Sequence, residues 1–269
     1  MRNDPDIETL VAAAEAAADA AAPACLAHFR DASLSAENKA AVGFDPVTAA
    51  DRASERAIRA VLARLRPDDA VRGEEETARP GTSGVEWVVD PIDGTRAFLC
   101  GAPTWGVLIA ANRGGRPMLG LVDQPFTGER FLGVAEERAP RAVWRRGGVE
   151  RRLATRACAA IEGATLLSTF PEIGTADDLR RFARVRDRAR LTRYGLDCYG
   201  YMLVALGQAD LVVEAGLAAY DVQALIPVIE AAGGVVTGWD GSGCSEGGRV
   251  LAAGDHRLHA EAVRLLSAD

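Results

Sequence analysis

A short apolar stretch that ends in two aspartates constrains this chain more than any other feature of its sequence. Residues 85–89 are almost wholly apolar, which predicts a β-strand. Pro91 cannot donate a hydrogen bond to a sheet and fixes its own φ, so we expect the strand to stop there. Asp90 and Asp93 are then held close together on a stiff turn, with the carbonyl group of Ile92 between them.

The residues after this turn add a site for an anion. Gly94 and Thr95 open a short predicted helix, whose first N–H groups have no partner inside the helix. Carboxylates, a carbonyl and free N–H groups in one turn suit a hard cation that bridges to a phosphate. The alternative interpretation is that Asp90 and Asp93 only cap the turn, as aspartate often does.

Further acidic positions extend the pattern. Glu74 follows Gly73 at the start of a run of glutamates, and Asp221 stands just ahead of a predicted apolar helix. Asp51 falls in the first turn of another helix, which we expect to begin near Val47. The alternative interpretation of Asp51 is a solvated aspartate that the helix dipole favours.

Together these pieces resemble the inositol monophosphatase family of magnesium-dependent, lithium-sensitive phosphatases. The stretch from Trp87 to Thr95 matches the family signature W-x-x-D-P-[IL]-D-G-T in full, and Glu74 lies at the usual distance before it. The resemblance runs from about Asp45 to Gly234. It implies a layered α/β fold, an αβαβα sandwich with an antiparallel meander in a first lobe and a mixed sheet in a second.

The resemblance also implies two Mg²⁺ ions, for which Mn²⁺ can substitute. It assigns Glu74, Asp90 and the carbonyl of Ile92 to one ion. Asp90, Asp93 and Asp221 would hold the second, with Asp90 bridging, and a third, weaker Mg²⁺ is expected near Glu74 through water. These are all oxygen ligands, which match Mg²⁺ or Mn²⁺ and not zinc.

Thr95 indicates catalysis rather than metal storage. In the family its hydroxyl pairs with the aspartate that matches Asp51 to orient a metal-activated water, so Thr95, Asp51 and Glu74 are the expected catalytic residues. The N–H groups of Gly94 and Thr95 would hold the phosphate. Lys39 stands where the family often has a lysine near the outer metal. The other class considered, a non-catalytic binding protein, is disfavoured because such a protein would be expected to lose at least one of these residues.

The substrate that the resemblance favours is L-histidinol phosphate. Residues 197–201 (Asp-Cys-Tyr-Gly-Tyr) and 214–217 (Glu-Ala-Gly-Leu) are similar to the histidinol-phosphatase subgroup. Histidinol carries an ammonium group and an imidazole, so its site gains from carboxylates beyond those that bind metal. Asp197 and Glu214 could supply these carboxylates beside Asp221. The alternative interpretations are a helix N-cap for Asp197 and a surface acid at a strand end for Glu214. Inositol phosphate is the alternative substrate, because Glu214 could equally accept hydrogen bonds from ring hydroxyls.

Composition limits the partners. The formal charge of −7 argues against nucleic acid, and an anionic substrate then needs a bound cation. The five scattered cysteines predict reduced thiols in a cytoplasmic protein. Residues 7–29 are rich in alanine but interrupted by acids, so we expect an amphipathic helix, no export signal and no membrane span. The resemblance implies a homodimer.

The order of apolar runs predicts a single catalytic domain of two lobes, residues 1–140 and 141–269. Residues 104–134 read as the antiparallel meander of the first lobe, because turn sequences separate their apolar runs. Beyond residue 140, a hairpin over 142–153 is followed by strands that alternate with helices, one of them over 221–232. Two residues, Cys100 and Gln223, depart from the family's usual pattern without removing an expected ligand.

Overall fold

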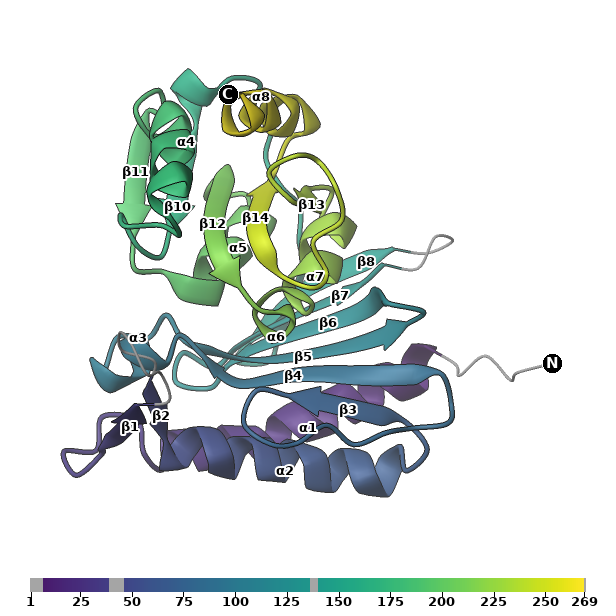
Figure 1. Ribbon diagram of the computed structural model, residues 1–269. Helices are drawn as coiled ribbons and strands as arrows, with labels where there is room; N and C mark the ends of the chain where they lie inside the picture. Colours follow the sequence, from purple (N-terminus) through teal and green to yellow (C-terminus); the bar gives the residue numbers. More distant parts are fainter. Residues whose placement is uncertain (1–6, 39–45, 136–139, 269) are drawn as a thin grey trace.

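The computed structural model describes residues 7–38, 46–135 and 140–268. Two sheets and three layers of helices stack in the order helix, sheet, helix, sheet, helix (Figure 1). This arrangement confirms the layered α/β fold and the αβαβα sandwich. We call the first sheet with its outer helices the N-terminal half, and the remaining layers the C-terminal half.

The first sheet has seven strands, in the order β3-β4-β5-β6-β7-β8-β9, and every neighbouring pair is antiparallel except β3 and β4. Its strands are β3 (Ala70–Gly73), β4 (Val85–Asp93), β5 (Gly106–Arg113), β6 (Arg116–Gln124), β7 (Glu129–Val134), β8 (Arg141–Arg146) and β9 (Val149–Arg152). The expected meander is therefore present. The expected lobe boundary near residue 140 is wrong, because β8 returns to pair with β7 and the sheet continues to Arg152.

The sequence predicted that strand β4 would stop at Pro91, because proline has no N–H group. This prediction is wrong, since β4 continues to Asp93. Asp90 pairs with Leu108 and Asp93 pairs with Gly106, with a register shift between them. Because the bulge leaves the residues between these pairs outside the ladder, the missing N–H group of Pro91 costs no sheet hydrogen bond. The bulge carries both aspartates out of the regular strand.

Helices α1 (Ile7–Leu26) and α2 (Ala49–Leu65) cover the outer face of the first sheet (Figure 1). By length and hydropathy alone α1 is apolar enough to cross a membrane, so the expectation that no run approaches a membrane span is wrong. Its buried face, which includes Leu10 and Ala17, belongs to the same apolar core as Trp87 and Ile109 of the sheet. The apolarity of α1 is thus explained by packing within the fold.

The layer between the sheets consists of α5 (Asp197–Ala205), α6 (Ala219–Val222) and α7 (Leu225–Ala231). The helix expected over residues 221–232 is thus two helices, which meet at Gln223 and Ala224. Val122 of the first sheet, Met202 of α5 and Val228 of α7 share one apolar core. That core joins the two halves.

The second sheet has five strands in the order β11-β10-β12-β14-β13, parallel from β11 to β12 and antiparallel beyond. Its strands are β10 (Thr165–Ser168), β11 (Leu191–Tyr194), β12 (Leu211–Leu217), β13 (Val235–Thr237) and β14 (Gly248–Ala253). Helices α4 (Ala176–Arg186) and α8 (His256–Ser267) cover its outer face. The mixed sheet agrees with expectation.

Four small elements complete the described chain. Strand β1 (Ala36–Asn38) pairs with β2 (Pro46–Thr48), and α3 (Thr95–Leu99) follows the bulge of β4. A turn of 3₁₀ helix spans Ile161–Gly163. Lys39 and Asp45, named above from the sequence, lie outside the described residues.

Candidate active site

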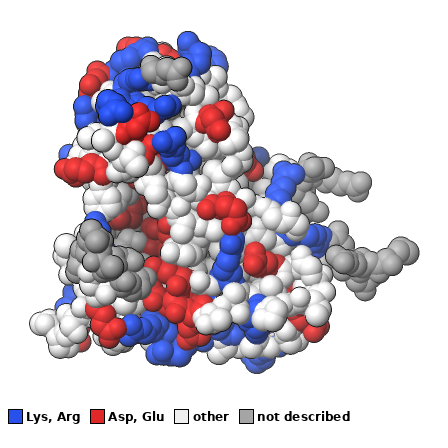
Figure 2. Space-filling view, in the orientation of Figure 1, with Lys and Arg blue, Asp and Glu red and all other residues white. Residues whose placement is uncertain are grey.

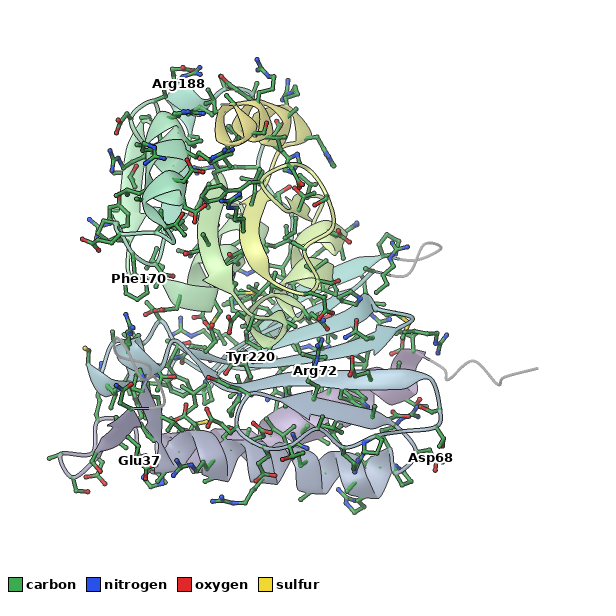
Figure 3. The ribbon with its side chains drawn as sticks, viewed as in Figure 1. Glu37, Asp68, Arg72, Phe170, Arg188 and Tyr220 are labelled. Atoms are coloured by element: carbon green, nitrogen blue, oxygen red, sulfur yellow. The ribbon has the colours of Figure 1, made fainter. Side chains whose placement is uncertain are left out.

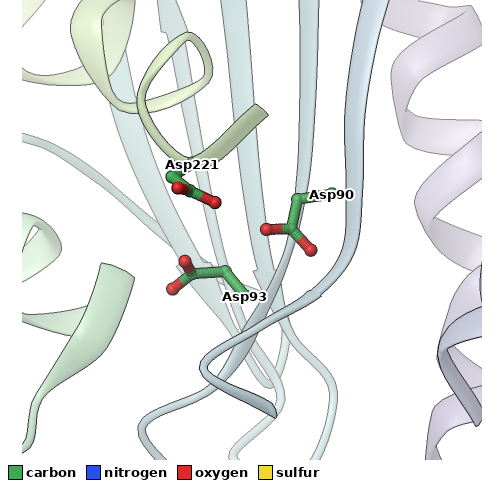
Figure 4. A group of neighbouring side chains, drawn as sticks. All are labelled: Asp90, Asp93 and Asp221. Atoms are coloured by element: carbon green, nitrogen blue, oxygen red, sulfur yellow. The ribbon is translucent and has the colours of Figure 1, made fainter. Parts of the chain in front are cut away.

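Three aspartates meet where the two halves face each other. Asp90 and Asp93 come from the end of β4, and Asp221 comes from α6 (Figure 4). Each offers a carboxylate oxygen, and these oxygens lie within 4.8 Å of one another. Figure 2 shows acidic side chains gathered in a hollow between the halves. Residues from both sheets' sides thus build one acidic centre, as the sequence predicted for these three.

Backbone N–H groups fix the orientation of all three carboxylates. The N–H of Ile92 donates to Oδ1 of Asp90 at 3.0 Å, and the N–H of Cys198 donates to Oδ2 of Asp93 at 2.8 Å. The N–H of Ala218 donates to Oδ2 of Asp221 at 2.7 Å. Asp90 therefore does cap its turn, but this bond uses only part of the acceptor capacity of a carboxylate.

The charges of this centre oppose one another in the absence of a cation. Burial raises the pKa of Asp90 well above its usual value, and the nearby charges of Glu74 and Asp93 add to the effect. Burial likewise raises the pKa of Asp93, and the charges of Asp221 and Asp197 raise it further. A hard divalent cation would remove this repulsion and is matched by an all-oxygen donor set. The residues present therefore fit Mg²⁺.

Glu74 stands apart from the three aspartates. It lies outside the group whose oxygens are within 4.8 Å, although its charge is close enough to raise the pKa of Asp90. The backbone just beyond it is held by Glu55 of α2, whose carboxylate accepts the N–H groups of Glu75 at 2.8 Å and Glu76 at 3.2 Å. Glu55 is fully buried and is paired with Arg59 at 2.7 Å.

Asp51 is buried and not solvated, which makes its alternative interpretation wrong. Its Oδ2 atom accepts the N–H of Thr48 at 2.8 Å and the hydroxyl of Thr48 at 2.6 Å, in a capping box at the start of α2. Its Oδ1 atom lies 3.4 Å from Oγ1 of Thr95, and that hydroxyl also lies 3.2 Å from the carbonyl oxygen of Ile92. Burial raises the pKa of Asp51. The structure thus brings together Asp51, Thr95 and Ile92.

A cleft of about 270 Å³ opens beside the acidic centre. Asp93, Gly94, Thr95 and Asp221 line it together with Asp197 and Glu214, the two acids that the sequence assigned to substrate recognition. Its remaining lining residues are Pro46, Arg96, Thr169, Phe170, Cys198, Tyr201, Ala215, Gly216, Leu217 and Leu225.

Asp197 opens α5 in an unusual backbone conformation. Its φ angle of 47° is positive, and Leu196, not Asp197, occupies the N-cap position, so the N-cap interpretation is wrong. The hydroxyl of Thr104 donates to Oδ2 of Asp197 at 3.1 Å. A Cβ atom at Gly94 would lie 3.0 Å from the Asp197 side chain, and the φ angle of Gly94 is 81°, so glycine is favoured at this position. Burial raises the pKa of Asp197, while the Thr104 bond and the charge of Arg96 lower it.

Glu214 is buried, so it is no surface acid at a strand end. It belongs to β12, and its Oε1 atom accepts the N–H of Thr169 at 2.6 Å. Burial raises the pKa of Glu214 to about 7, against the opposing effect of the bond to Thr169. A buried carboxyl beside other acids is well suited to pair with a cationic group of a ligand.

Gln223, which departs from the family pattern, is part of a polar link behind Asp221. Its Nε2 atom donates to the carbonyl oxygen of Ser245 at 2.8 Å, and its Oε1 atom accepts from Nδ2 of Asn112 on β5. Both side chains are buried. The break between α6 and α7 is thereby tied to the first sheet.

Sequence reasoning missed several residues that shape this site, among them Glu55, Arg96, Thr169 and Phe170. A signal existed for Glu55, since it stands one helical turn after Asp51 and so shares its face of α2. For Thr169 and Phe170 the sequence offers no signal, because their place depends on how the second sheet packs against the first.

Comparison with known proteins agrees with this geometry. A model described as the inositol monophosphatase family matches residues 6–268. The chain is 36% identical over 275 residues to a protein of Arabidopsis thaliana named bifunctional phosphatase IMPL2, chloroplastic, which covers 98% of this chain and 77% of that protein. It is 37% identical over 258 residues to a histidinol-phosphatase of Streptomyces coelicolor, covering 93% and 94% of the two chains. The solved structure of an inositol monophosphatase from Zymomonas mobilis superposes with a TM-score of 0.85 at 37% identity, covering 98% and 100%.

Proposed function

Because this chain belongs to the inositol monophosphatase family, we propose that it is a phosphatase whose substrate is L-histidinol phosphate, which it hydrolyses to L-histidinol and phosphate. The family is Mg²⁺-dependent and acts on phosphate monoesters. The observation that carries the choice of substrate is the presence of Asp197 and Glu214 in the cleft that Asp93 and Asp221 of the acidic centre also line. The similarity to a histidinol-phosphatase at 37% identity supports it.

The metal centre would use the oxygen atoms already described. Asp90, Asp93 and Asp221 would hold one Mg²⁺, and Glu74, Asp90 and the carbonyl oxygen of Ile92 would hold the other. When bound, Mg²⁺ supplies positive charge that stabilises the attacking and leaving oxygens of an in-line displacement at phosphorus. The fixed N–H donors to the three carboxylates keep them aimed at one point, so little reorganisation accompanies binding.

Thr95 and Asp51 would position the attacking water. The Thr95 hydroxyl lies within reach of both Oδ1 of Asp51 and the carbonyl oxygen of Ile92, so its own proton has an acceptor and its lone pairs can orient a water. The water oxygen attacks phosphorus, the P–O bond to the alcohol breaks, and the leaving oxygen takes up the proton that the attacking water releases. The N–H groups at Gly94 and Thr95 would hold the phosphate during this step.

Recognition of the alcohol would rest on Asp197 and Glu214. Each accepts one hydrogen bond within the protein, from Thr104 and Thr169 respectively, and a carboxylate has room for more. Histidinol carries an ammonium group, and a charge-assisted hydrogen bond contributes about 1.5–3 kcal/mol. Inositol offers only hydroxyl groups to the same carboxylates.

Inositol phosphate is the second candidate substrate. The Zymomonas mobilis structure, at 37% identity over nearly the whole chain, is named as an inositol monophosphatase. Glu214 lines the cleft and can accept hydrogen bonds from hydroxyls as well as from an ammonium group. The two candidates differ in how much binding should depend on the charge of Asp197: strongly for histidinol phosphate, and little for inositol phosphate.

Steady-state phosphate release with the two esters tests this proposal. We expect kcat/KM to favour histidinol phosphate in the wild type, and Asp197→Ala to lose mainly that preference. Asp187→Ala, which removes an exposed aspartate at the end of α4, is the matched control and should change neither rate. Faster cleavage of inositol phosphate, with Asp197→Ala neutral, would make inositol phosphate the substrate. No release from any small ester in Mg²⁺ would overturn the phosphatase assignment.

The remaining expectations from the family resemblance are part of the same proposal. We expect Li⁺ to inhibit by competing at the second metal, and a homodimer in the cytoplasm. Inhibition of phosphate release across a Li⁺ titration and the mass from light scattering measure the first two. Full activity in high Li⁺ or a monomer at every concentration would contradict them.

A further inference from the structure

An aromatic side chain stands at the mouth of the cleft, and the chemistry above does not use it. Phe170 lines the cleft although its side chain is 41% exposed. Figure 3 labels it at the lower edge of the C-terminal half, facing the side on which α3 lies. Its position places a large apolar ring beside a cavity whose other walls are rich in carboxylates.

The backbone on both sides of this ring is fixed from within the protein. The N–H of Thr169 donates to Oε1 of the buried Glu214 at 2.6 Å, and the hydroxyl of Ser168 donates to the carbonyl oxygen of Phe170 at 3.3 Å. Glu214 belongs to β12, a central strand of the second sheet. The backbone at Phe170, which lies in the loop after β10, is therefore tied to strands of the second sheet.

The ring also has a partner on the opposite wall. The guanidinium carbon of Arg96 lies 4.9 Å from the centroid of the Phe170 ring, within the range of a cation–π contact. Arg96 belongs to α3 in the N-terminal half, whereas Phe170 follows β10 in the C-terminal half. The pair thus spans the mouth of the cleft and orients the ring across it.

We propose that Phe170 is a specificity-determining residue, whose ring packs against a planar heteroaromatic group of the substrate. The inference rests on the proposed function and deepens it, because it selects phosphate esters that carry an aromatic ring over polyol phosphates. Asp197 and Glu214, deeper in the same cleft, remain for the ammonium group of such an ester.

The chemistry of the two candidate substrates separates them at this residue. An imidazole can stack on a phenyl ring in an offset or edge-to-face arrangement, and a protonated imidazole adds a cation–π attraction. An inositol ring is saturated and covered with hydroxyl groups, so it gains neither contact and would have to desolvate hydroxyls against an apolar surface. The ring of Phe170 therefore favours one ester and disfavours the other.

Steady-state kinetics of Phe170→Ala, Phe170→Leu and Phe170→Tyr with L-histidinol phosphate, inositol 1-phosphate and phenyl phosphate test the inference. We expect Phe170→Ala to raise KM for histidinol phosphate about tenfold with little change in kcat, since the ring contributes binding and takes no part in the bond changes. Phe170→Leu should behave like the alanine variant, and Phe170→Tyr like the wild type. The kcat/KM for inositol phosphate should stay within about twofold in all of them.

The control is Leu191→Ala, which truncates a similarly exposed apolar residue on edge strand β11, outside the cleft lining. Leu191→Ala should leave kcat and KM unchanged for all three esters. Thermal unfolding should show that each Phe170 variant folds as the wild type does, because the side chain of Phe170 is exposed.

The outcomes separate this inference from the proposed function. If the wild type prefers histidinol phosphate and Phe170→Ala keeps that preference, the inference falls and the proposed function stands. A second outcome is that the wild type prefers phenyl phosphate to histidinol phosphate, and that only Phe170→Ala and Phe170→Leu lose this preference. The role of Phe170 then stands, and the choice of histidinol phosphate as the substrate is wrong. A wild type that prefers inositol phosphate overturns both, and an equal loss on all esters assigns Phe170 a purely structural role.

Discussion

A Cβ atom on Gly73 would lie 2.0 Å from Oε1 of Glu55, so helix α2 and the loop that carries Glu74 meet through a contact that only glycine permits. At this contact the Glu55 carboxylate accepts the backbone N–H groups of Glu75 and Glu76. One turn earlier on the same helix, Asp51 approaches Thr95. Helix α2 therefore sets the position of both acidic loops relative to each other.

Glu55→Gln should weaken Mg²⁺ binding several-fold without touching a ligand. The amide keeps one acceptor oxygen but loses the second, so one of the N–H groups of the loop loses its charged partner at a cost of about 1–3 kcal/mol in unfolding free energy. Calorimetric Mg²⁺ titration and urea unfolding measure the two effects. Glu162→Gln removes an exposed carboxylate that pairs with Arg188 and is the matched control. Wild-type Mg²⁺ affinity in Glu55→Gln would show that the loop holds its place without α2.

Asp93→Asn should abolish most turnover while the metal-free protein becomes more stable. The change removes a negative charge that is repelled by the carboxylates of Asp221 and Asp197. It keeps an oxygen that can accept a hydrogen bond from the N–H group of Cys198. Loss of a residue beside a metal ligand commonly costs 10–100-fold in activity, so loss of a ligand should cost more than about 100-fold. Phosphate release and thermal unfolding in EDTA check the two halves of this prediction. Near-native turnover at limiting Mg²⁺ would remove Asp93 from the ligand set.

Glu214→Gln should change how the stability of the metal-free protein depends on pH. The folded-state pKa of Glu214 is about 7, raised from 4.5, so the native protein binds more protons than the unfolded chain between these values. The stability that this group contributes is therefore fully present below pH 4.5 and is lost as pH rises through 7. Glutamine does not titrate. As pH rises from 5 to 8, the free energy of unfolding of the variant should therefore increase relative to that of the wild type by up to about 3 kcal/mol. Urea unfolding of both proteins in EDTA measures the gap, and a gap that is constant with pH would contradict the prediction.

Gln223→Ala should destabilise the fold through the groups that it leaves behind. Nδ2 of Asn112 and the carbonyl oxygen of Ser245 would each lose a partner, at about 1–3 kcal/mol for a buried group. Removing both side chains, in the double variant Asn112→Val with Gln223→Leu, should cost less than the sum of Asn112→Val and Gln223→Leu, since neither amide of the pair is then left without its partner and the Ser245 carbonyl oxygen is orphaned only once. A double-mutant cycle on urea unfolding measures this coupling, and strict additivity would show that the link is not cooperative.

The acids of the site could be read from the sequence because their spacing is local. Asp90, Asp93 and Thr95 lie on one turn, and their chemistry is meaningful before any tertiary contact is known. The layered fold followed from the alternation of strands and helices and from the family resemblance. Glu74, which the resemblance assigns to the other metal, lies outside the group formed by Asp90, Asp93 and Asp221, and its charge raises the pKa of Asp90.

What could not be read depends on contacts between distant segments. Strand β11 is an edge strand with alternating exposed residues, and no apolar run marks it. The continuation of β4 past Pro91 needs β5 to pair with Asp93 beyond the bulge. The division of one expected helix at Gln223 accompanies hydrogen bonds to Asn112 on β5 and to Ser245 in the loop before β14. None of these partners is a neighbour in the sequence.

The origin of the three aspartates from two halves of the chain also sets an order of events during refolding. Asp90 and Asp93 can take their places once β4 has paired with β5, but Asp221 joins them only when α6, which follows β12 of the second sheet, packs against β4. Closing so long a loop is slow compared with forming helices and hairpins. Recovery of phosphatase activity should therefore lag behind recovery of far-ultraviolet circular dichroism, because the acidic centre needs contacts between segments far apart in the sequence.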